Sequence, residues 1–334
     1  MEANNSKTEE FDLKSLKNTK RQHYVPQFYL DYWVVPHGVD VKSKIEGSKP
    51  EYPQYYSVGI GMERYFYEIE MDDTVWNMLN YRYGEEAKTD QFIKKILDEL
   101  HLLKRFDDIG SKGIGIVNPD EVALKNLQGI LLHLKKHHLE DAYGRIERVI
   151  SSEINRFVDS QDSDTFVPPT QFTFENVLMF YGLQRLRTRE RIDSINSEIS
   201  EMILSRGDCE TVLTDIQKQS VMKCILYISS LQFCKVLEKA ECTMNILKNK
   251  TDLDYITSDC PAMYFERGTY SMEYAVGMLP LSPKLLVVFK IPDLEKKGNR
   301  EMGYDFISDE KHVRGTNVLI ERNSYNFVYT KIRK

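Results

Sequence analysis

The sequence predicts an α+β protein in which a long-helix central bundle packs against a mostly antiparallel sheet built from the N- and C-terminal parts. In the middle of the chain, from about residue 74 to 238, apolar residues recur at the helical spacings of three and four. Residues 24–67 are instead rich in Tyr, Pro and Gly, and short β-branched and aromatic runs follow residue 244. Helices in one block and strands in two others are typical of the α+β class.

Each helix has its own signal. Phe92, Ile93, Ile96 and Leu97 begin an apolar face, and Asn118 followed by Pro119 and Glu121 is a helix-start pattern. A loop with two prolines, residues 159–169, separates the second long helix from the third. Helices are expected over residues 74–106, 118–158, 173–205, 210–237 and 309–322. Strands are expected over residues 253–257, 262–265, 275–279, 285–290 and 325–330.

The length of 334 residues is sufficient for one large domain. We expect a mobile N-terminal lead-in over residues 1–19 and a single α+β domain over residues 20–334, with a β-rich C-terminal part from about 244. The formal net charge is −6, so the chain as a whole does not attract nucleic acid. Binding to nucleic acid would therefore require a local basic patch.

Several features predict a cytoplasmic protein. The longest apolar run, residues 285–289, is far shorter than the roughly 20 residues that span a bilayer, so no membrane segment is expected. The first twenty residues lack the apolar stretch of an export signal. The five cysteines form no C-x-x-C pair, which indicates reduced thiols.

Two short motifs concentrate the residues that could carry chemistry. Residues 23–30 read HYVPQFYL, and residues 257–261 read TSDCP. Together they resemble a bacterial domain family of unknown function that is marked by an N-terminal HYVPQxYL motif and a downstream TSDxP motif. That family usually has Asn where this chain has Cys260. The resemblance implies a shared fold and a shared site, and it extends over roughly residues 20 to 330.

His23 and Asp259 are the candidate catalytic residues. The pKa of an imidazole lies near neutrality, which suits proton transfer or metal binding, and Asp259 could act as a base or orient His23. Ser258 and Thr257 offer hydroxyl groups to an anion, and Gln27 offers an amide. The structural alternatives are a packed histidine and an Asp that caps its own turn.

The third helix carries polar residues on its apolar face. Gln184, Arg187, Thr188 and Arg191 share that face with Val177, Phe180, Tyr181, Ile195 and Ile199. A buried guanidinium needs a carboxylate, carbonyl groups or an anionic ligand, so these residues are candidates for substrate binding. Residues 184–188 also look like a Q-x-x-R-T element of the resembled family. The alternative is a structural network inside a bundle.

Two further groups are weaker candidates. In the second helix, His138 lies on the apolar stripe, where a core histidine satisfied by Asp141 is favoured over a metal ligand, and His137 is expected at the surface. Glu85 and Glu86 are expected at the start of a helix, where carboxylates are favoured. They could join His23 and Asp259 around a divalent metal ion.

The sequence contains no P-loop, dinucleotide, zincin or nucleophile-elbow motif. We therefore expect an intracellular enzyme acting on a phosphate-bearing substrate, such as a nuclease-type hydrolase in bacterial conflict or phage defence. In this reading Arg187 holds the anion while His23 and Asp259 act as acid, base or metal ligand. The alternative is a non-catalytic binding or interaction protein whose polar motif residues form a structural network. The sequence leaves open whether the partner is nucleic acid, a nucleotide, another protein or a second copy of the chain. It also leaves open whether a divalent metal ion is the cofactor.

Overall fold

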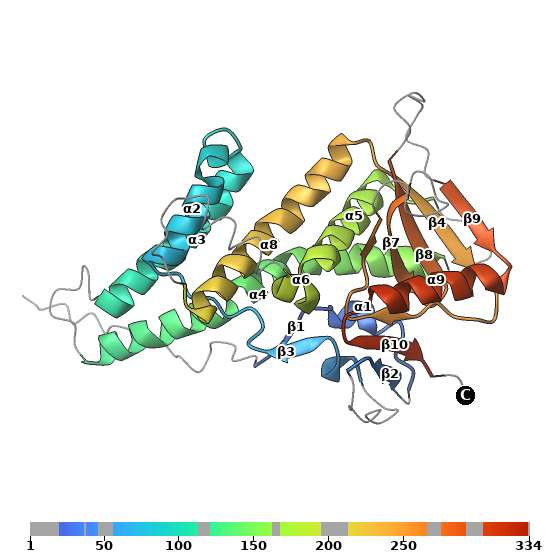
Figure 1. The fold of residues 1–334 in the computed structure, drawn as a ribbon, viewed down its shortest axis with the longest axis horizontal. Coiled ribbons are helices and arrows are strands. Elements are labelled where there is room, and N and C mark those ends of the chain that lie inside the picture. Colours follow the sequence, from blue (N-terminus) through green and yellow to red (C-terminus); the bar gives the residue numbers. More distant parts are fainter. Residues whose placement is uncertain are drawn as a thin grey trace, which may run out of the picture. The chain divides into compact units, whose positions relative to one another are not determined.

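The computed structural model describes residues 20–36, 38–45, 56–112, 121–161, 168–194, 213–265, 275–291 and 303–332. The expected lead-in over residues 1–19 and the helix start at Asn118 lie outside these ranges. The α+β class is confirmed: long helices occupy the middle of the chain, and the strands belong to its N- and C-terminal parts (Figure 1).

The chain forms two compact units. The first comprises residues Met1–Lys20, Tyr67–Asp141 and Leu213–Val221, and the second comprises Arg21–Phe66, Ala142–Val212 and Met222–Lys334. Two long helices, α4 (Glu121–Ser160) and α8 (Asp215–Lys239), contain residues of both units.

In the first unit, α2 (Asp73–Ala87) and α3 (Gln91–Lys112) pack together. The helical pattern over residues 74–106 therefore corresponds to two helices. The break comes from Asp90, whose carboxylate accepts a hydrogen bond from the N–H of Phe92 at 2.8 Å and so starts α3. Asp72 caps α2 in the same way, through the N–H of Val75. Glu85 and Glu86 thus lie in the last turn of α2, and their expected position at a helix start was wrong.

The described residues of the second unit form three sheets. The first pairs β1 (Arg21–His23) with β3 (Met62–Arg64), and the second has the order β2 (Val39–Ser43), β10 (Phe327–Lys331) and β5 (Thr257–Ser258). The third has the order β6 (Met263–Tyr264), β7 (Ala275–Ser282), β8 (Leu285–Lys290), β4 (Thr243–Asn249) and β9 (Gly303–Ile307). All these strand pairs are antiparallel except β4–β9, which is parallel. The predicted meeting of the two chain ends in a sheet occurs in the β2–β10–β5 sheet.

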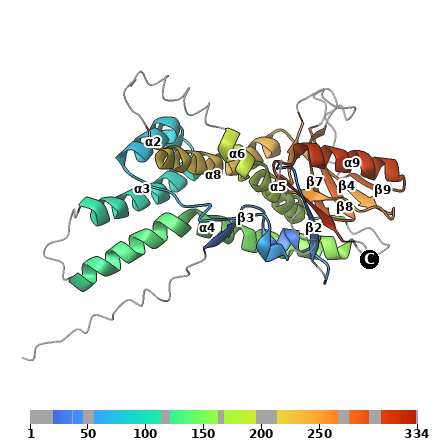
Figure 2. The ribbon, with the colours of Figure 1, turned by 60° about the horizontal axis from the view of Figure 1, so that its bottom comes forward.

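Helices cover both faces of the five-stranded sheet. On one face lies α9 (Glu310–Asn323) (Figure 2). Its Val313 and Ile320 belong to the core that also contains Leu286 of β8. On the other face, Tyr181 of α5 (Gln171–Leu186) packs its ring 4.6 Å from the ring of Phe289. The Tyr181 hydroxyl donates to the carbonyl of Met263, and a Cβ atom at position 277 would lie only 1.8 Å from its oxygen. Gly277 is therefore required for this contact.

The helix expected over residues 173–205 is shorter than predicted. The α5 helix ends at Leu186, and its C-cap Arg187 has φ −96° and ψ 27°, outside the helical region. A separate short helix, α6 (Arg189–Ser194), follows, and residues 195–205 lie outside the described ranges. The prediction that one helical face carries Arg191 together with Gln184 and Arg187 was therefore wrong.

Two more expectations concern α4 and α8. His137 is only 3% exposed and its Nδ1 lies 2.9 Å from a carboxylate oxygen of Glu140, so its expected surface position was wrong, whereas His138 is half-buried. In the described part of the chain, α8 alone is long and apolar enough to cross a membrane. Because 61% of its apolar window is buried inside the protein, α8 has the character of a core helix in a soluble protein.

Candidate functional site

The N-terminal motif begins as a strand and turns into a single helical turn. The N–H groups of Tyr24 and Val25 both donate to the carbonyl of Gly61, next to the β1–β3 pair. Pro26, extended at φ −61° and ψ 139°, then starts α1 (Gln27–Leu30). The proline therefore changes the chain direction, and it leaves Gln27 exposed at the first position of α1.

The two motifs contact each other directly. The Tyr29 hydroxyl lies 2.7 Å from the Thr257 hydroxyl and donates to the carbonyl of Pro280 at 2.8 Å. Trp33 adds a second link, because its indole N–H donates to the carbonyl of Tyr255. All five of these side chains and carbonyls are buried. The hydrogen bonds explain physically why an aromatic N-terminal motif and a distant TSDxP motif occur in one fold.

Asp259 is held entirely by the backbone. Its Oδ1 accepts from the N–H of Tyr325 at 3.0 Å, and its Oδ2 accepts from the N–H groups of Asn326 and Phe327 at 2.7 and 3.1 Å. The residue is 1% exposed. Burial raises the pKa of Asp259, while these three N–H groups act in the opposite direction. The carboxylate thus fixes the chain between α9 and β10.

Other residues of the TSDCP segment are used in the same way. The Ser258 hydroxyl accepts from the N–H of Cys260, and both residues are buried. From α9, Asn317 binds the segment just before the motif, and Asn323 donates to the carbonyl of Cys260. The Ser258 hydroxyl is therefore used in a turn inside the protein. Its role in substrate binding stays a prediction.

Arg187 connects three segments of the second unit. Its Nε donates to the carbonyl of Tyr24 at 3.0 Å, and a terminal nitrogen forms an ion pair with Glu147 of α4. The guanidinium lies 5.0 Å from the ring centre of Tyr143. With the Gln184 amide oxygen turned toward it, Gln184 accepts from Arg187 at 3.2 and 3.3 Å. Arg187 is 2% exposed, so these contacts satisfy its charge inside the protein.

Thr188 and Arg191 occupy different surroundings. Thr188 is buried, forms a hydrogen bond with the Cys260 side chain and accepts from the N–H of Arg191. The Nε of Arg191 lies 3.6 Å from a carboxylate oxygen of Glu190 on α6. Thr188 therefore links the break after α5 to the TSDCP segment. We call Tyr24, Glu147, Gln184, Arg187, Thr188, Asp259 and Cys260 the motif network.

His23 lies beside the motif network and is half-buried. Its Nε2 is 3.3 Å from the carbonyl oxygen of Ser57, in η2 (Ser57–Gly59). Burial lowers the pKa of His23, and the nearby Arg187 guanidinium lowers it further, while Glu147 and Asp31 act in the opposite direction. The imidazole is therefore largely neutral at pH 7.

The structure brings together most of the predicted site residues, but as a buried network. Gln184, Arg187, Thr188, Ser258 and Asp259 belong to the second unit and are joined as described above, and His23 of the same unit lies beside them. Gln27 is exposed on α1, and Glu85 and Glu86 belong to the first unit. Among the described residues, no group of three or more His, Cys, Asp or Glu side chains could hold a metal ion. The expected ligand set combines Glu85 and Glu86 of the first unit with His23 and Asp259 of the second, and it stays a prediction.

Tyr143 and Glu147 were missed by the sequence reasoning. They are four residues apart, so they lie on the same side of α4, next to the buried residues Ala142 and Ile150. An ionisable residue adjacent to an apolar stripe is the signal that could have indicated Glu147. Its partner could not be identified, because Arg187 lies forty positions further along the chain.

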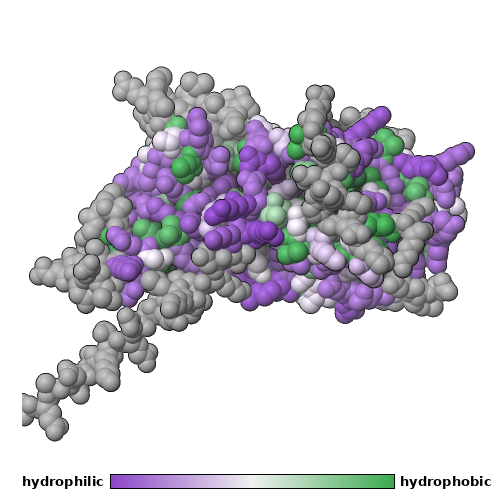
Figure 3. Space-filling model, turned by 90° about the horizontal axis from the view of Figure 1, so that it is seen from below, coloured by the Kyte–Doolittle hydropathy of each residue, from purple (hydrophilic) through white to green (hydrophobic). Residues whose placement is uncertain are grey.

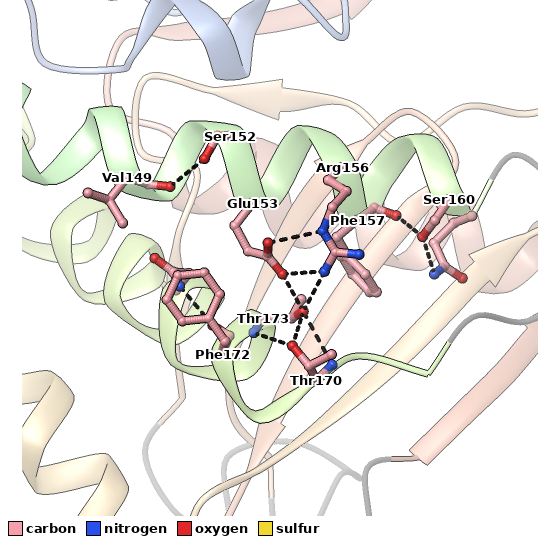
Figure 4. Close-up of polar contacts among 11 residues, drawn as sticks. Val149, Ser152, Glu153, Arg156, Phe157, Ser160, Thr170, Phe172 and Thr173 are labelled. Atoms are coloured by element: carbon pink, nitrogen blue, oxygen red, sulfur yellow. Dashed lines mark hydrogen bonds and ion pairs between the residues drawn. The ribbon is translucent and has the colours of Figure 1, made fainter.

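A second polar cluster joins α4 to the start of α5 (Figure 4). Glu153 accepts from Arg156 Nε and from its terminal nitrogen at 3.1 and 2.6 Å, and from the Thr173 hydroxyl at 2.5 Å. Thr170 and Thr173 form a reciprocal cap at the start of α5. We call Glu153, Arg156, Thr170 and Thr173 the Glu153 cluster, and it fixes the start of the helix that carries Gln184.

Comparison with known proteins identifies the family and nothing closer. No curated protein and no solved structure matches the chain. The family model described as "Protein of unknown function (DUF4238)" matches residues 21–334, which include both motifs. The chain therefore belongs to the DUF4238 family.

Proposed function

We propose that this chain is a non-catalytic binding or interaction protein, in which the residues of the two motifs form a structural network. The observation that supports this proposal is the surroundings of Asp259. Both of its oxygens accept hydrogen bonds from backbone N–H groups, and the residue is 1% exposed. A catalytic base must reach a proton on its substrate, and this carboxylate has no access to solvent.

Arg187 supports the same proposal. An anion-binding arginine must direct donors toward the ligand, whereas this guanidinium is directed at Tyr24, Glu147 and Gln184. These partners come from three separate segments, so their shared effect is to hold the N-terminal motif against the helices. We place the protein in the cytosol, since the four described cysteines are buried and free of disulfide bonds.

The test compares stability with activity. Asp259→Ala leaves three backbone N–H groups without their acceptor, and we expect the free energy of unfolding to fall by on the order of 2 to 4 kcal/mol. Chemical denaturation followed by circular dichroism measures this loss. The matched control is Asp305→Ala, because Asp305 is exposed on β9 and should tolerate the change. Unchanged stability in Asp259→Ala, together with loss of an enzymatic activity, would contradict the proposal.

A second candidate function is favoured by His23. This imidazole is half-buried, and electrostatic interactions with Arg187 and Glu147 affect its pKa. A histidine with a shifted pKa is a candidate general base. In this alternative the protein is an intracellular hydrolase that acts on a phosphate-bearing substrate, of the nuclease or phosphodiesterase type. Bacterial conflict or phage defence is the context associated with such an enzyme.

The test of the second candidate uses His23→Ala in nuclease and phosphatase assays with added Mg²⁺ or Mn²⁺. A catalytic His23 predicts loss of the activity with a melting temperature within a few degrees of the wild type. If the wild-type protein hydrolyses neither oligonucleotides nor phosphate monoesters, the second candidate is rejected and the binding function remains.

A further inference from the structure

The β1–β3 ribbon places two arginines directly opposite each other. In its antiparallel register, Arg21 faces Arg64, Gln22 faces Glu63, and His23 faces Met62. Side chains directly opposite in such a pair lie on the same face, with their Cβ atoms about 4.5–5.5 Å apart. Both arginines are exposed. Like charges in this position destabilise the strand pair unless a counter-charge is present.

The protein supplies no such counter-charge among the described residues. Neither Arg21 nor Arg64 forms an ion pair there, and the one contact of the Arg64 guanidinium is with the ring of Tyr65 at 5.3 Å. The available carboxylate, Glu63, accepts instead from Arg189 at 3.0 and 3.1 Å. Glu63 also alternates with Arg64 along β3 and is therefore directed to the other face of the ribbon.

The rest of the ribbon is fixed in place. Gln22, which follows Arg21 and faces Glu63, is fully buried, and the N–H groups of Tyr24 and Val25 bind the carbonyl of Gly61 at 2.9 and 3.1 Å. The two guanidinium groups thus extend from a rigid base. Figure 3 shows one face of the molecule, on which strongly hydrophilic side chains gather.

We propose that Arg21 and Arg64 form a binding site for the phosphate groups of a nucleic acid strand or a free nucleotide. A guanidinium presents a planar set of N–H donors that matches phosphate oxygens, and two adjacent arginines can bind one phosphate or two successive ones. The net charge of −6 makes a local basic site necessary for any such binding. The inference gives the proposed binding function a ligand class.

The experiment measures the anisotropy of a short fluorescein-labelled single-stranded oligonucleotide with the full chain, and the heat of binding of ATP. We expect Arg21→Gln/Arg64→Gln to weaken binding at least about tenfold at low salt. With the oligonucleotide, the slope of log K against log salt should become less negative by about 1.4, which corresponds to two lost phosphate contacts. The melting temperature without ligand should not fall, because the variant removes a repulsion.

The matched control is Arg148→Gln/Arg322→Gln, which also removes two exposed arginines of the second unit. It should change binding less than twofold. Binding of the oligonucleotide alone assigns the site to a nucleic acid backbone, whereas binding of ATP alone assigns it to a free nucleotide.

The proposal is overturned if the wild-type protein binds neither probe, or if the control weakens binding as much as the ribbon variant. Either result would leave the motif network unaffected, since that assignment depends on the unfolding of Asp259→Ala.

Discussion

The motif network and the Glu153 cluster each place a carboxylate where two segments of the second unit meet, but they differ in how far along the sequence they reach. Asp259 binds backbone N–H groups that are 66 to 68 positions away. Glu153 binds Arg156 and Thr173, which are 3 and 20 positions away. The network thus connects distant parts of the chain, whereas the cluster reinforces one helix start.

Exposure separates the two regions as well. The Arg187 side chain is 1% exposed, and that of Arg156 is 57% exposed. A buried charge loses its hydration and depends on its protein partners, whereas an exposed one can exchange them for water. Substitutions in the motif network should therefore have larger effects than those in the Glu153 cluster.

After Asp259→Ala, the largest effect in this comparison is expected for Arg187→Lys. Lysine keeps the charge but lacks Nε and the planar group that lies over Tyr143, so the carbonyl of Tyr24 loses its donor. We expect a loss of about 2 kcal/mol in the free energy of unfolding, measured by urea denaturation. Arg185→Lys, two residues earlier in the last turn of α5 and partly exposed, is the control and should cost little. If the two substitutions lower the free energy of unfolding equally, the buried contacts of Arg187 do not stabilise the protein more than those of the partly exposed Arg185.

A smaller effect is expected for Glu153→Gln. The hydrogen bonds from Arg156 and then Thr173 lower the pKa of Glu153 below its ordinary value of 4.5. Because the pKa is lower in the folded protein, the stabilisation is present above the ordinary value of 4.5. It is lost as the pH falls through the pKa of the folded state.

At pH 7 we expect Glu153→Gln to lose about 1 kcal/mol, and the difference from the wild type should shrink below pH 4. Thermal unfolding over a pH series measures it. The exposed Glu175 of α5 provides the control, as Glu175→Gln. A difference that does not shrink at all as the pH falls below 4.5 would show that the carboxylate charge is not responsible.

The smallest effect is expected for His23→Gln at pH 7, where the imidazole is already neutral. Burial lowers the pKa of His23 below 6.5, so the unfolded chain binds a proton more readily than the folded one. The stability of the wild type should therefore decline as the pH falls below 6.5.

His23→Gln should show a shallower decline between pH 6.5 and 5, measured by the midpoint of denaturant unfolding. His312→Gln is the matched control, because the His312 side chain is 72% exposed. Identical pH profiles for the wild type and His23→Gln would show that His23 is not buried against the motif network.

Local patterns predicted much of the fold. The strand over residues 285–290 and the helix near residues 309–322 were found from short runs of apolar and capping residues. The strands β4 and β9 were missed. Lys248 and Asn249 end β4 and Asp305 interrupts β9, so neither strand has a continuous apolar pattern.

The helix over residues 173–205 shows why some boundaries could not be predicted. The periodicity of residues 184 to 191 fits one helix, yet the helix ends at Leu186. Arg187 leaves the helical conformation while it binds Tyr24 and Glu147, and these contacts depend on residues outside the local window. Tertiary contacts thus outweighed local helix propensity.

For the candidate site, the sequence by itself indicated several of the residues that the motif network contains. The density of polar and aromatic groups in residues 23–30, the TSDCP motif and an arginine on an apolar face all indicated residues that the structure joins in one network. These signals are local, because residue type and spacing along a strand or helix fix them.

Only the tertiary structure decided what those residues bind. The oxygens of Asp259 could have faced a substrate, a metal ion or the backbone, and the fold brings the N–H groups of residues 325–327 to them. The same holds for Arg21 and Arg64, whose opposition depends on a strand register across 43 positions. Partners so distant in sequence leave no local pattern, because long-range packing alone sets their distance.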